Sequence, residues 1–190
     1  METPEPNLDP SESLKLITET ISKTKEDLKE HGFCFMLWGW LIAIASISFY
    51  MLHHFTDFKY YFLPFPVLVA IGIVVTLLYY RRRRDLSETY LTYYLKRMWI
   101  VLASCFIIVV LANVFQHHQP FMYTILIGGI GTLVSGIVLR FRPLLVGGVL
   151  FLVAYIFSVD VQQQLIPLIQ GIAVITGYLI PGYLLKYSKA

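Results

Sequence analysis

The chain has 190 residues, of which 57% are hydrophobic and 14% are charged, and its formal net charge is +3. A soluble globular domain carries about 25% charged residues, so this composition excludes an ordinary water-soluble domain and favours lipid as the surrounding medium. The small net charge and the lack of a recognition motif argue against nucleic-acid binding, and we expect no nucleic-acid partner.

The first 31 residues are polar and are predicted to form a cytoplasmic segment. Residues 1–9 are rich in proline and acids and are expected to be disordered. Asp9, Pro10 and Glu12 have the pattern of a helix start, which predicts a helix over residues 10–31. The segment lacks the short apolar core of a signal peptide, so the first span is expected to supply the membrane address.

The predicted helix 10–31 is amphipathic, because apolar residues recur in it at spacings of three, four and seven. These residues are Leu14, Ile17, Ile21 and Leu28. The stripe is narrow and lacks the strongly basic polar face of a helix that binds an anionic membrane. The pattern therefore favours contact with a neighbouring helix, with an unknown cytoplasmic or membrane protein, or with a second copy through a short coiled coil. Gly32 is predicted to be the joint with the membrane part.

Six apolar stretches follow, each near the length of about 20 residues that crosses the hydrocarbon of a bilayer. They are residues 33–52, 62–80, 98–115, 121–139, 143–159 and 165–185. We predict an all-α integral membrane protein, with a six-transmembrane-helix bundle over residues 32–190 and an N-terminal amphipathic cytoplasmic helix. The lipid bilayer is its first expected partner.

The third predicted span begins before it enters the membrane. Ser87 is a candidate helix cap, and apolar residues at helical spacing extend the helix from Ser87 to Phe115. This helix is expected to protrude into the cytoplasm. Its Tyr90, Tyr93 and Tyr94 would then offer a face on which the stripe of residues 14–21 is expected to dock.

The basic residues predict the orientation, because Lys and Arg gather in short cytoplasmic loops near span ends. With six spans, one side collects fourteen of the fifteen basic residues, and the other side holds only Lys59. We expect both termini in the cytoplasm and a multi-pass protein of the bacterial cytoplasmic (inner) membrane. The residues expected to anchor this topology and to contact anionic headgroups are Arg81, Arg82, Arg83, Arg84, Lys96, Arg97, Arg140 and Arg142.

Small residues indicate where helices approach closely in lipid. Gly128, Thr132 and Gly136 recur at every fourth residue of the fourth span, and Ala173 and Gly177 do so in the sixth. These two spans are expected at the bundle centre or at a homo-oligomer interface. The two three-span halves show no internal repeat.

The last span contains a proline and a glycine close to its end. Pro181 and Gly182 predict a kink or an early end of the helix, and a gating hinge is the alternative.

Histidines and carboxylates lie at the outer ends of several spans. The candidate metal ligands are His53, His54, Asp57, His117, His118 and Asp160. Imidazole and carboxylate groups suit zinc or copper. The spacing matches no defined motif, however, and histidine is common at membrane interfaces as a polar tip on an apolar body. We therefore predict no cofactor and keep a metal site as the less favoured alternative.

The predicted spans hold no ionised side chain well inside them, whereas transport and proton relay usually require one. The sequence also has no nucleophile–base pair, metalloprotease helix or phosphate loop, so we do not expect an enzyme. The polar residues that remain in the spans predict hydrogen bonds between helices, or alternatively the lining of an oligomeric channel or transporter for a small ion or solute. They are Asn113, Thr132, Ser135 and Gln170.

A resemblance to a known family rests on three segments, which are "ESLKLITETISKTKEDLKEHGFCFMLWGWL", "YTILIGGIGTLVSGIVLRFRPLLVGGVL" and "YLIPGYLL". They resemble a family of small uncharacterised polytopic membrane proteins common in Bacteroidetes, and the glycine-rich spans are similar in texture to HdeD-like acid-resistance membrane proteins. The resemblance implies a small multi-pass protein and no particular activity. The sequence thus predicts a non-enzymatic membrane protein of structural, sensory or accessory role that acts through its first helix and through oligomerisation.

Overall fold

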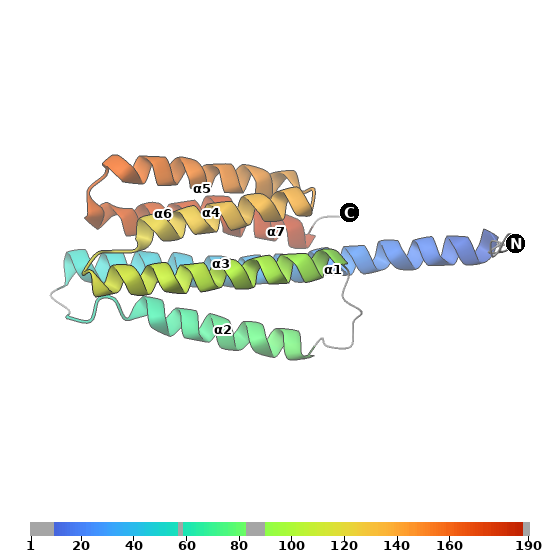
Figure 1. Ribbon diagram of the computed structural model, residues 1–190, viewed down its shortest axis with the longest axis horizontal. Helices are drawn as coiled ribbons and strands as arrows, with labels where there is room; N and C mark the ends of the chain where they lie inside the picture. Colours follow the sequence, from blue (N-terminus) through green and yellow to red (C-terminus); the bar gives the residue numbers. More distant parts are fainter. Residues whose placement is uncertain (1–9, 57–58, 83–89, 188–190) are drawn as a thin grey trace, which may run out of the picture.

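Figure 1 shows the computed structural model, which describes residues 10–56, 59–82 and 90–187. These residues form helices and turns and no strand. In chain order the elements are α1 (Pro10–Phe55), α2 (Pro64–Arg82), α3 (Tyr90–Phe115), α4 (Phe121–Val138), α5 (Arg142–Asp160), the 3₁₀ turn η1 (Gln163–Leu165), α6 (Ile166–Val174), the π-helical segment η2 (Ile175–Leu179) and α7 (Ile180–Tyr187).

Six helical stretches are long and apolar enough to cross a membrane, and they are Gly32–Phe55, Pro64–Arg82, Tyr93–Phe115, Phe121–Val138, Arg142–Asp160 and Gln163–Tyr187. They match the six predicted stretches, with ends that shift by a few residues. The predicted all-helical fold with six apolar helices is confirmed. The last of the six is built from η1, α6, η2 and α7 in one continuous run.

The bundle has two distinct ends. At the basic end, α2 finishes in Arg81 and Arg82, α5 begins at Arg142, and α7 carries Lys186 in its last turn. At the histidine end, α1 finishes with His53 and His54. The first and last described residues, Pro10 and Tyr187, lie towards the basic end (Figure 1).

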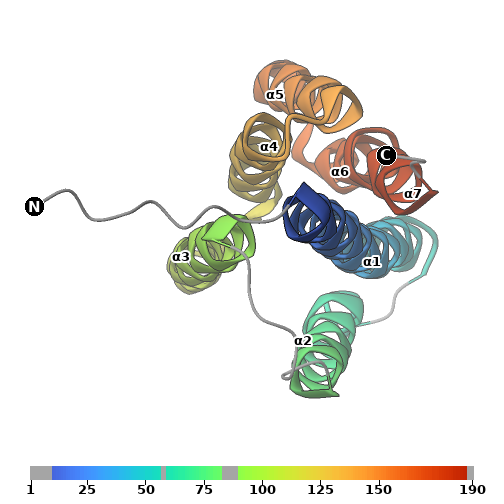
Figure 2. The same cartoon turned by 90° about the vertical axis from the view of Figure 1, so that its right-hand side faces the viewer.

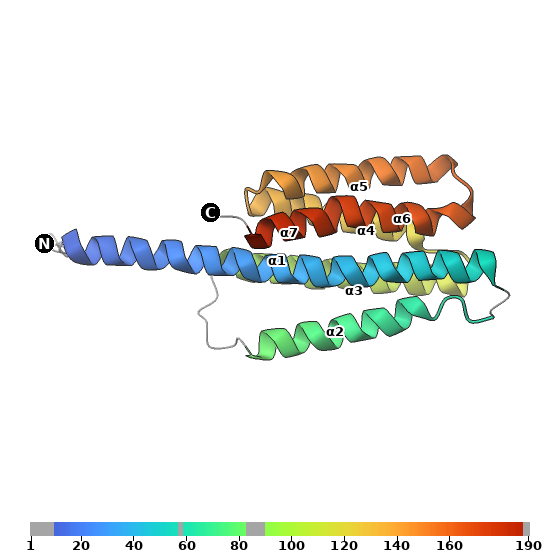
Figure 3. The same ribbon diagram turned by 180° about the vertical axis from the view of Figure 1, so that it is seen from behind.

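The first helix is a single uninterrupted element of 46 residues. The structure therefore differs from the prediction of a joint at Gly32, which lies inside the helix and faces the backbone of Lys186, 2.9 Å from the place of a Cβ. One glycine lowers helix stability by about 1 kcal/mol, which is too little to break a long helix that packs on Lys186 at this point. The first part of α1 extends beyond the bundle at its basic end (Figures 1 and 3).

This projection also changes the expected contact between the first and third helices. The first part of α1 extends past the described start of α3 at Tyr90 (Figures 1 and 3). The predicted docking of residues 14–21 on the tyrosines of α3 is therefore not formed with the described part of that helix, because α1 continues straight and does not fold back. Ser87, the predicted start of the third helix, lies outside the described residues.

Seen from one end, the other helices surround the second half of α1 on most sides (Figure 2). The pairs with extensive packing are α4 with α5, and α1 with α6, η2 and α7. Helix α2 packs mainly on α1, and α3 packs mainly on α4. In the same view α2 and α3 are separated from each other (Figure 2).

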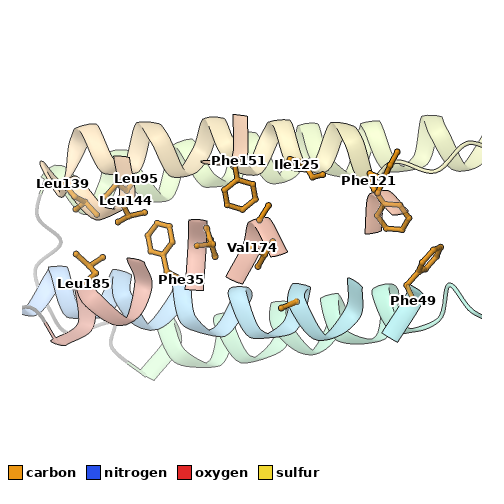
Figure 4. Close-up of a cluster of buried hydrophobic side chains, with 14 residues drawn as sticks. Phe35, Phe49, Leu95, Phe121, Ile125, Leu139, Leu144, Phe151, Val174 and Leu185 are labelled. Carbon is orange, nitrogen blue, oxygen red and sulfur yellow. The ribbon is translucent and has the colours of Figure 1, made fainter. Parts of the chain in front are cut away.

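A cluster of buried apolar side chains runs along the bundle between these helices (Figure 4). Leu95, Leu139, Leu144 and Leu185 fill its basic end, and Phe49 and Phe121 meet at its histidine end with ring centroids 4.8 Å apart. Burying side chains of this size removes apolar surface from the lipid-facing exterior and packs it at high density. The core therefore joins all the helices except α2, which contributes only partly buried residues.

The last helix accommodates its proline by widening rather than by ending. Pro181 has no N–H for the carbonyl of Gly177, and the preceding residues Ile175–Leu179 form a π-helical turn. The helix then continues to Tyr187. The predicted early end of the helix at Pro181 is wrong, because the π-helical turn accommodates both the loss of one backbone hydrogen bond and the proline ring.

Two short turns depend on residues with left-handed backbone conformation. His117, after α3, has φ 57°, and Arg140, after α4, has φ 51°. In each turn the next N–H returns to a carbonyl five residues earlier, from His118 to Asn113 over 2.9 Å and from Phe141 to Gly136 over 3.0 Å. This is the hydrogen-bond pattern of a Schellman cap, which ends a helix and redirects the chain sharply.

Candidate functional site at the basic end

The candidate site consists of the basic end of the bundle and the projecting part of α1. Its position depends on the packing contacts between the helices of the bundle. Gly136 of α4 faces the backbone of α5, and a Cβ on it would lie 2.6 Å from the Leu145 nitrogen. Gly148 of α5 faces α4 in the same way, 2.6 Å from the Leu133 nitrogen. These two glycines let α4 and α5 touch along their backbones.

A second backbone contact joins α5 to the π turn of the last helix. A Cβ on Gly147 would overlap the carbonyl oxygen of Gly177, and a Cβ on Gly177 would lie 2.7 Å from the carbonyl oxygen of Gly147. The Gly177 carbonyl is the one for which Pro181 has no N–H, and it lies against Gly147, which leaves no room for a side chain at position 147.

Of the other small residues predicted for helix packing, Thr132 and Ala173 are buried and Gly128 is partly buried. Thr132 is fully buried and donates to the Gly128 carbonyl over 2.7 Å, and Ala173 lies in the core. Gly128 itself faces the Phe151 ring at an ordinary distance of 3.5 Å. Sequence spacing located Gly136 and Gly177 but missed Gly147 and Gly148, which are adjacent residues and show no four-residue repeat.

Two tryptophans hold the less buried helices. Trp38 of α1 lies on Gly72 of α2 and donates to the Thr76 hydroxyl over 3.2 Å. Trp99 of α3 lies on Gly131 of α4 and donates to the Ser135 hydroxyl over 3.2 Å. These pairs were not predicted, because each tryptophan and its glycine lie on different helices and meet only in the packed bundle.

Aromatic and basic side chains meet at the basic end. Phe33 stacks on Tyr79 with centroids 4.3 Å apart, and the Cys34 thiol lies 3.4 Å from the Tyr80 hydroxyl. The Lys96 ammonium sits 4.5 Å above the ring of Tyr80. Because Lys96 belongs to α3 and Tyr80 to α2, this cation–π contact joins the two helices at this end.

The predicted headgroup anchors lie at the same end of the bundle. Arg81, Arg82, Arg97, Arg140 and Arg142 are all exposed. Arg83 and Arg84 lie outside the described residues. Exposed guanidinium groups at one end of a bundle can bind anionic phosphates in a membrane surface.

The predicted metal ligands are not brought together among the described residues. No group of three His, Cys, Asp or Glu side chains there could hold a metal ion, and Asp57 lies outside the description. His53 contacts the Tyr61 ring with centroids 4.6 Å apart, and His54 stacks on Tyr50 at 5.6 Å. His117 is the left-handed residue that ends α3.

The polar residues of the spans bond in separate places. Asn113 donates to the Val109 carbonyl of its own helix over 2.8 Å. Gln170 and Ser135 form bonds between helices, from the Thr124 hydroxyl to Gln170 Oε1 over 3.1 Å and from Trp99 to Ser135. The predicted hydrogen bonds between helices are therefore formed by Ser135 and Gln170, whereas Asn113 and Thr132 donate to carbonyls of their own helices instead.

Comparison of the chain with protein-family models, with curated proteins and with solved structures finds no match. The resemblance to small membrane proteins of Bacteroidetes stays a prediction.

Proposed function

We propose that this chain is a non-enzymatic multi-pass protein of the bacterial cytoplasmic membrane, which presents the first part of α1 as a contact element for a partner protein. Its role would be structural, sensory or accessory. The observation that carries the proposal is the single helix from Pro10 to Phe55, which is packed inside the bundle over its second half and extends beyond the bundle over its first half.

The basic end supports a cytoplasmic position for both termini. Arg81, Arg82, Arg140, Arg142 and Lys186 lie at this end, and Lys59 follows the opposite end of α1. The positive-inside rule assigns the basic side to the cytoplasm.

The orientation is tested by replacing Arg81 and Arg82 together with Arg83 and Arg84 by serine. We expect altered accessibility of single cysteines placed at the two ends of the bundle, measured with a membrane-impermeant thiol reagent in intact cells. A matched control replaces the same four arginines by lysine, which keeps the positive charge and should leave the labelling unchanged. Unchanged labelling in the first variant would contradict the role of these arginines as topology anchors.

The continuity of α1 supports its role as a contact element. A helix that continues into a packed bundle loses little further conformational entropy when a partner binds, because its backbone is already fixed. Its packing on the Lys186 backbone through Gly32 fixes the point at which it leaves the bundle. A partner would therefore meet a preformed helix, with Leu14, Ile17, Ile21 and Leu28 at the positions that sequence spacing places on one stripe.

The contact element is tested by photo-cross-linking in native membranes. A photoreactive amino acid at residue 17 or 21 should give one defined cross-linked product, whereas the same group at residue 19 or 23 serves as the control on the charged face. A second copy of the chain and a different protein are distinguished by mass spectrometry of the product. Equal products from both faces would contradict the proposal.

A further inference from the structure

The projecting part of α1 repeats the face with which the second half of the same helix packs on the last span, Gln163–Tyr187. An uninterrupted α-helix completes five turns in about 18 residues, or about 27 Å, so positions that far apart lie on one face. The four residues of the apolar stripe and their counterparts 18 positions later are Leu14 and Gly32, Ile17 and Phe35, Ile21 and Gly39, and Leu28 and Ser46.

All four counterparts contact the last span, and we call this face of α1 the seam. The contacts join Gly32 to Lys186, Phe35 to Gly182, Gly39 to Leu179 and Ser46 to Gly171. They are close, because a Cβ on Gly32 would lie 2.9 Å from the Lys186 nitrogen, and a Cβ on Gly182 would lie 2.9 Å from Phe35 Cβ. The seam therefore runs along α1 up to the level at which this helix leaves the bundle.

The other faces of α1 do not keep their apolar character beyond Gly32. The residues 18 positions before the exposed Trp40, Ile44 and Ile47 are Ser22, Glu26 and Lys29. Those 18 positions before Trp38 and Leu41, which contact α2, are Thr20 and Lys23. Of the leucines and isoleucines in residues 10–31, Leu16 alone lies off the seam face. The apolar stripe is thus the continuation of the seam.

The residue types on the seam face change where α1 leaves the bundle. Inside the bundle, glycines on both helices bring the backbones together, which is the kind of contact favoured in lipid, where no hydrophobic drive for association exists. Beyond Gly32 the same face carries leucine and isoleucine, whose burial drives association in water. This change is the one expected of a helix–helix contact that continues from the membrane into the cytoplasm.

A second copy of the chain does not fit along this face. Copies in one membrane share one orientation, so a second α1 packed on the stripe would run parallel to the first. Because α1 is continuous to Phe55, that second helix would enter the space beside Gly32 and Phe35 that α7 already fills (Figure 2). The described part of α7 ends at Tyr187, next to Lys186, and α1 continues beyond it (Figures 1 and 3). An occupant of the whole stripe must therefore end above Lys186.

We propose that the stripe receives a short amphipathic helix of another protein, which ends above Lys186 and lies in line with the last span. This inference rests on the proposed function of α1 as a contact element. The stripe from Leu14 to Leu28 is about 21 Å long, so the partner helix would have about four turns. Lys25 occupies the position of Ala43 at the edge of the seam face, and Lys186 lies at the end of the stripe. The partner helix therefore presents apolar residues at spacings of three and four, with acidic residues beside them.

The first test uses a defined occupant that is built into the full chain. A helical extension of about four turns is joined to Ala190, with leucines placed in phase with Leu179, Gly182 and Lys186 and with glutamates beside them. The matched control has the same composition, but its leucines are moved by two positions and face away from α1. A photoreactive amino acid at residue 17 reports the contact in the purified protein in lipid nanodiscs.

We expect the in-phase extension to cross-link to residue 17 and the rotated extension not to do so. In native membranes the in-phase extension should also lower the yield of the product between residue 17 and the native partner about tenfold, since a tethered helix has an effective concentration on the order of mM. Equal cross-linking of the two extensions, or an undiminished yield of the partner product, would overturn the proposal.

The second test identifies the occupant in native membranes. Two differently tagged forms of the chain are co-expressed, and the product from residue 17 should contain one tag only. A photoreactive group in place of Tyr187, which is 69% exposed, should capture the same protein, whereas the control group in place of Arg82, at the end of α2, should not. A product that contains both tags would overturn this inference and leave the contact element standing. Absence of any defined product at residues 17 and 21 would contradict the proposed function as well.

Discussion

The core of this bundle, formed by α1 and α4 to α7, and its flank, formed by α2 and α3, are built from similar apolar residues but pack differently. In the most apolar 18-residue window of each span, 61% of residues are buried in the last span, against 6% in α2 and none in α3, and the buried Leu95 lies in α3 outside that comparison. The core helices meet through glycine backbones, as at Gly147 and Gly177, whereas the flank meets the core through side chains that include the indoles of Trp38 and Trp99. Because lipid would supply no hydrophobic drive for association, we expect the more closely packed helices to be the more firmly attached.

The largest expected effect tests the backbone contacts of the core. Gly147→Ala places a methyl group against the Gly177 carbonyl, and backbone cannot move aside as a side chain can. We expect the free energy of unfolding to fall by about 2–3 kcal/mol, measured by titration with dodecyl sulfate in mixed micelles. Gly128→Ala is the control, because its Cβ would lie at an ordinary 3.5 Å from Phe151, and it should change stability by less than about 0.5 kcal/mol. Equal losses of unfolding free energy in the two variants would show that the contact at Gly147 is no tighter than the contact at Gly128.

A buried polar pair gives the next effect in the core. Thr124→Val removes the hydroxyl that lies 3.1 Å from Gln170 Oε1, and Gln170 is only 4% exposed. The same hydroxyl lies 2.7 Å from the Phe121 carbonyl, and its one proton serves one acceptor at a time. Because Thr124→Val leaves the buried Gln170 amide without this polar partner, which costs about 1–3 kcal/mol, we expect a loss of about 1.5 kcal/mol in the same titration. The double variant Thr124→Val with Gln170→Leu should recover much of this loss. Failure to recover would show that Thr124 acts through its packing alone.

The corresponding substitution in the flank should have a smaller effect. In Gly131→Ala the new methyl group meets Trp99 Cη2 and Leu102 Cδ1, which are the far ends of side chains that can shift. We expect a loss of about 1 kcal/mol, at the lower limit for overpacking. A loss as large as that of Gly147→Ala would mean that the flank is held as rigidly as the core.

The smallest expected effect concerns the two left-handed turns, one beside the flank and one in the core. His117→Gly and Arg140→Gly remove a side chain from positions with φ 57° and 51°. Glycine adopts this conformation at little steric cost, so each change should stabilise the chain by about 0.5 kcal/mol. Because the backbone strain is confined to each turn, the two increases in the free energy of unfolding should be equal. A difference between them would show that the core constrains its turn and the flank does not.

The sequence was sufficient for the architecture because long apolar stretches have few alternative structures in lipid. The six stretches and their ends follow from hydropathy and from residues such as Pro143 and Pro167, which lie in the first turns of their helices. The continuity of α1 at Gly32 and of the last helix at Pro181 was not predicted. In both places the local preference for a break is outweighed by packing against a neighbouring helix, which spacing alone does not reveal.

The candidate site was predicted less completely. Residue type and position indicated the arginines and the packing role of Gly136. The pairing of Trp38 with Thr76 and of Trp99 with Ser135 depends on which helices become neighbours, and no periodicity in one helix contains that information. The same holds for His117, whose role as a helix-ending residue depends on backbone geometry rather than on its imidazole.

The length of α1 determines how far from the bundle a bound partner would lie. The 22 residues ahead of Gly32 span about 33 Å at 1.5 Å per residue, which places the tip roughly three to four Debye lengths from the basic end at physiological ionic strength. At that height the charge of an anionic leaflet is largely screened. The tip of the helix would therefore sample the cytosol and not the membrane surface, and α1 would act as a spacer that holds its partner at a fixed distance from the bilayer.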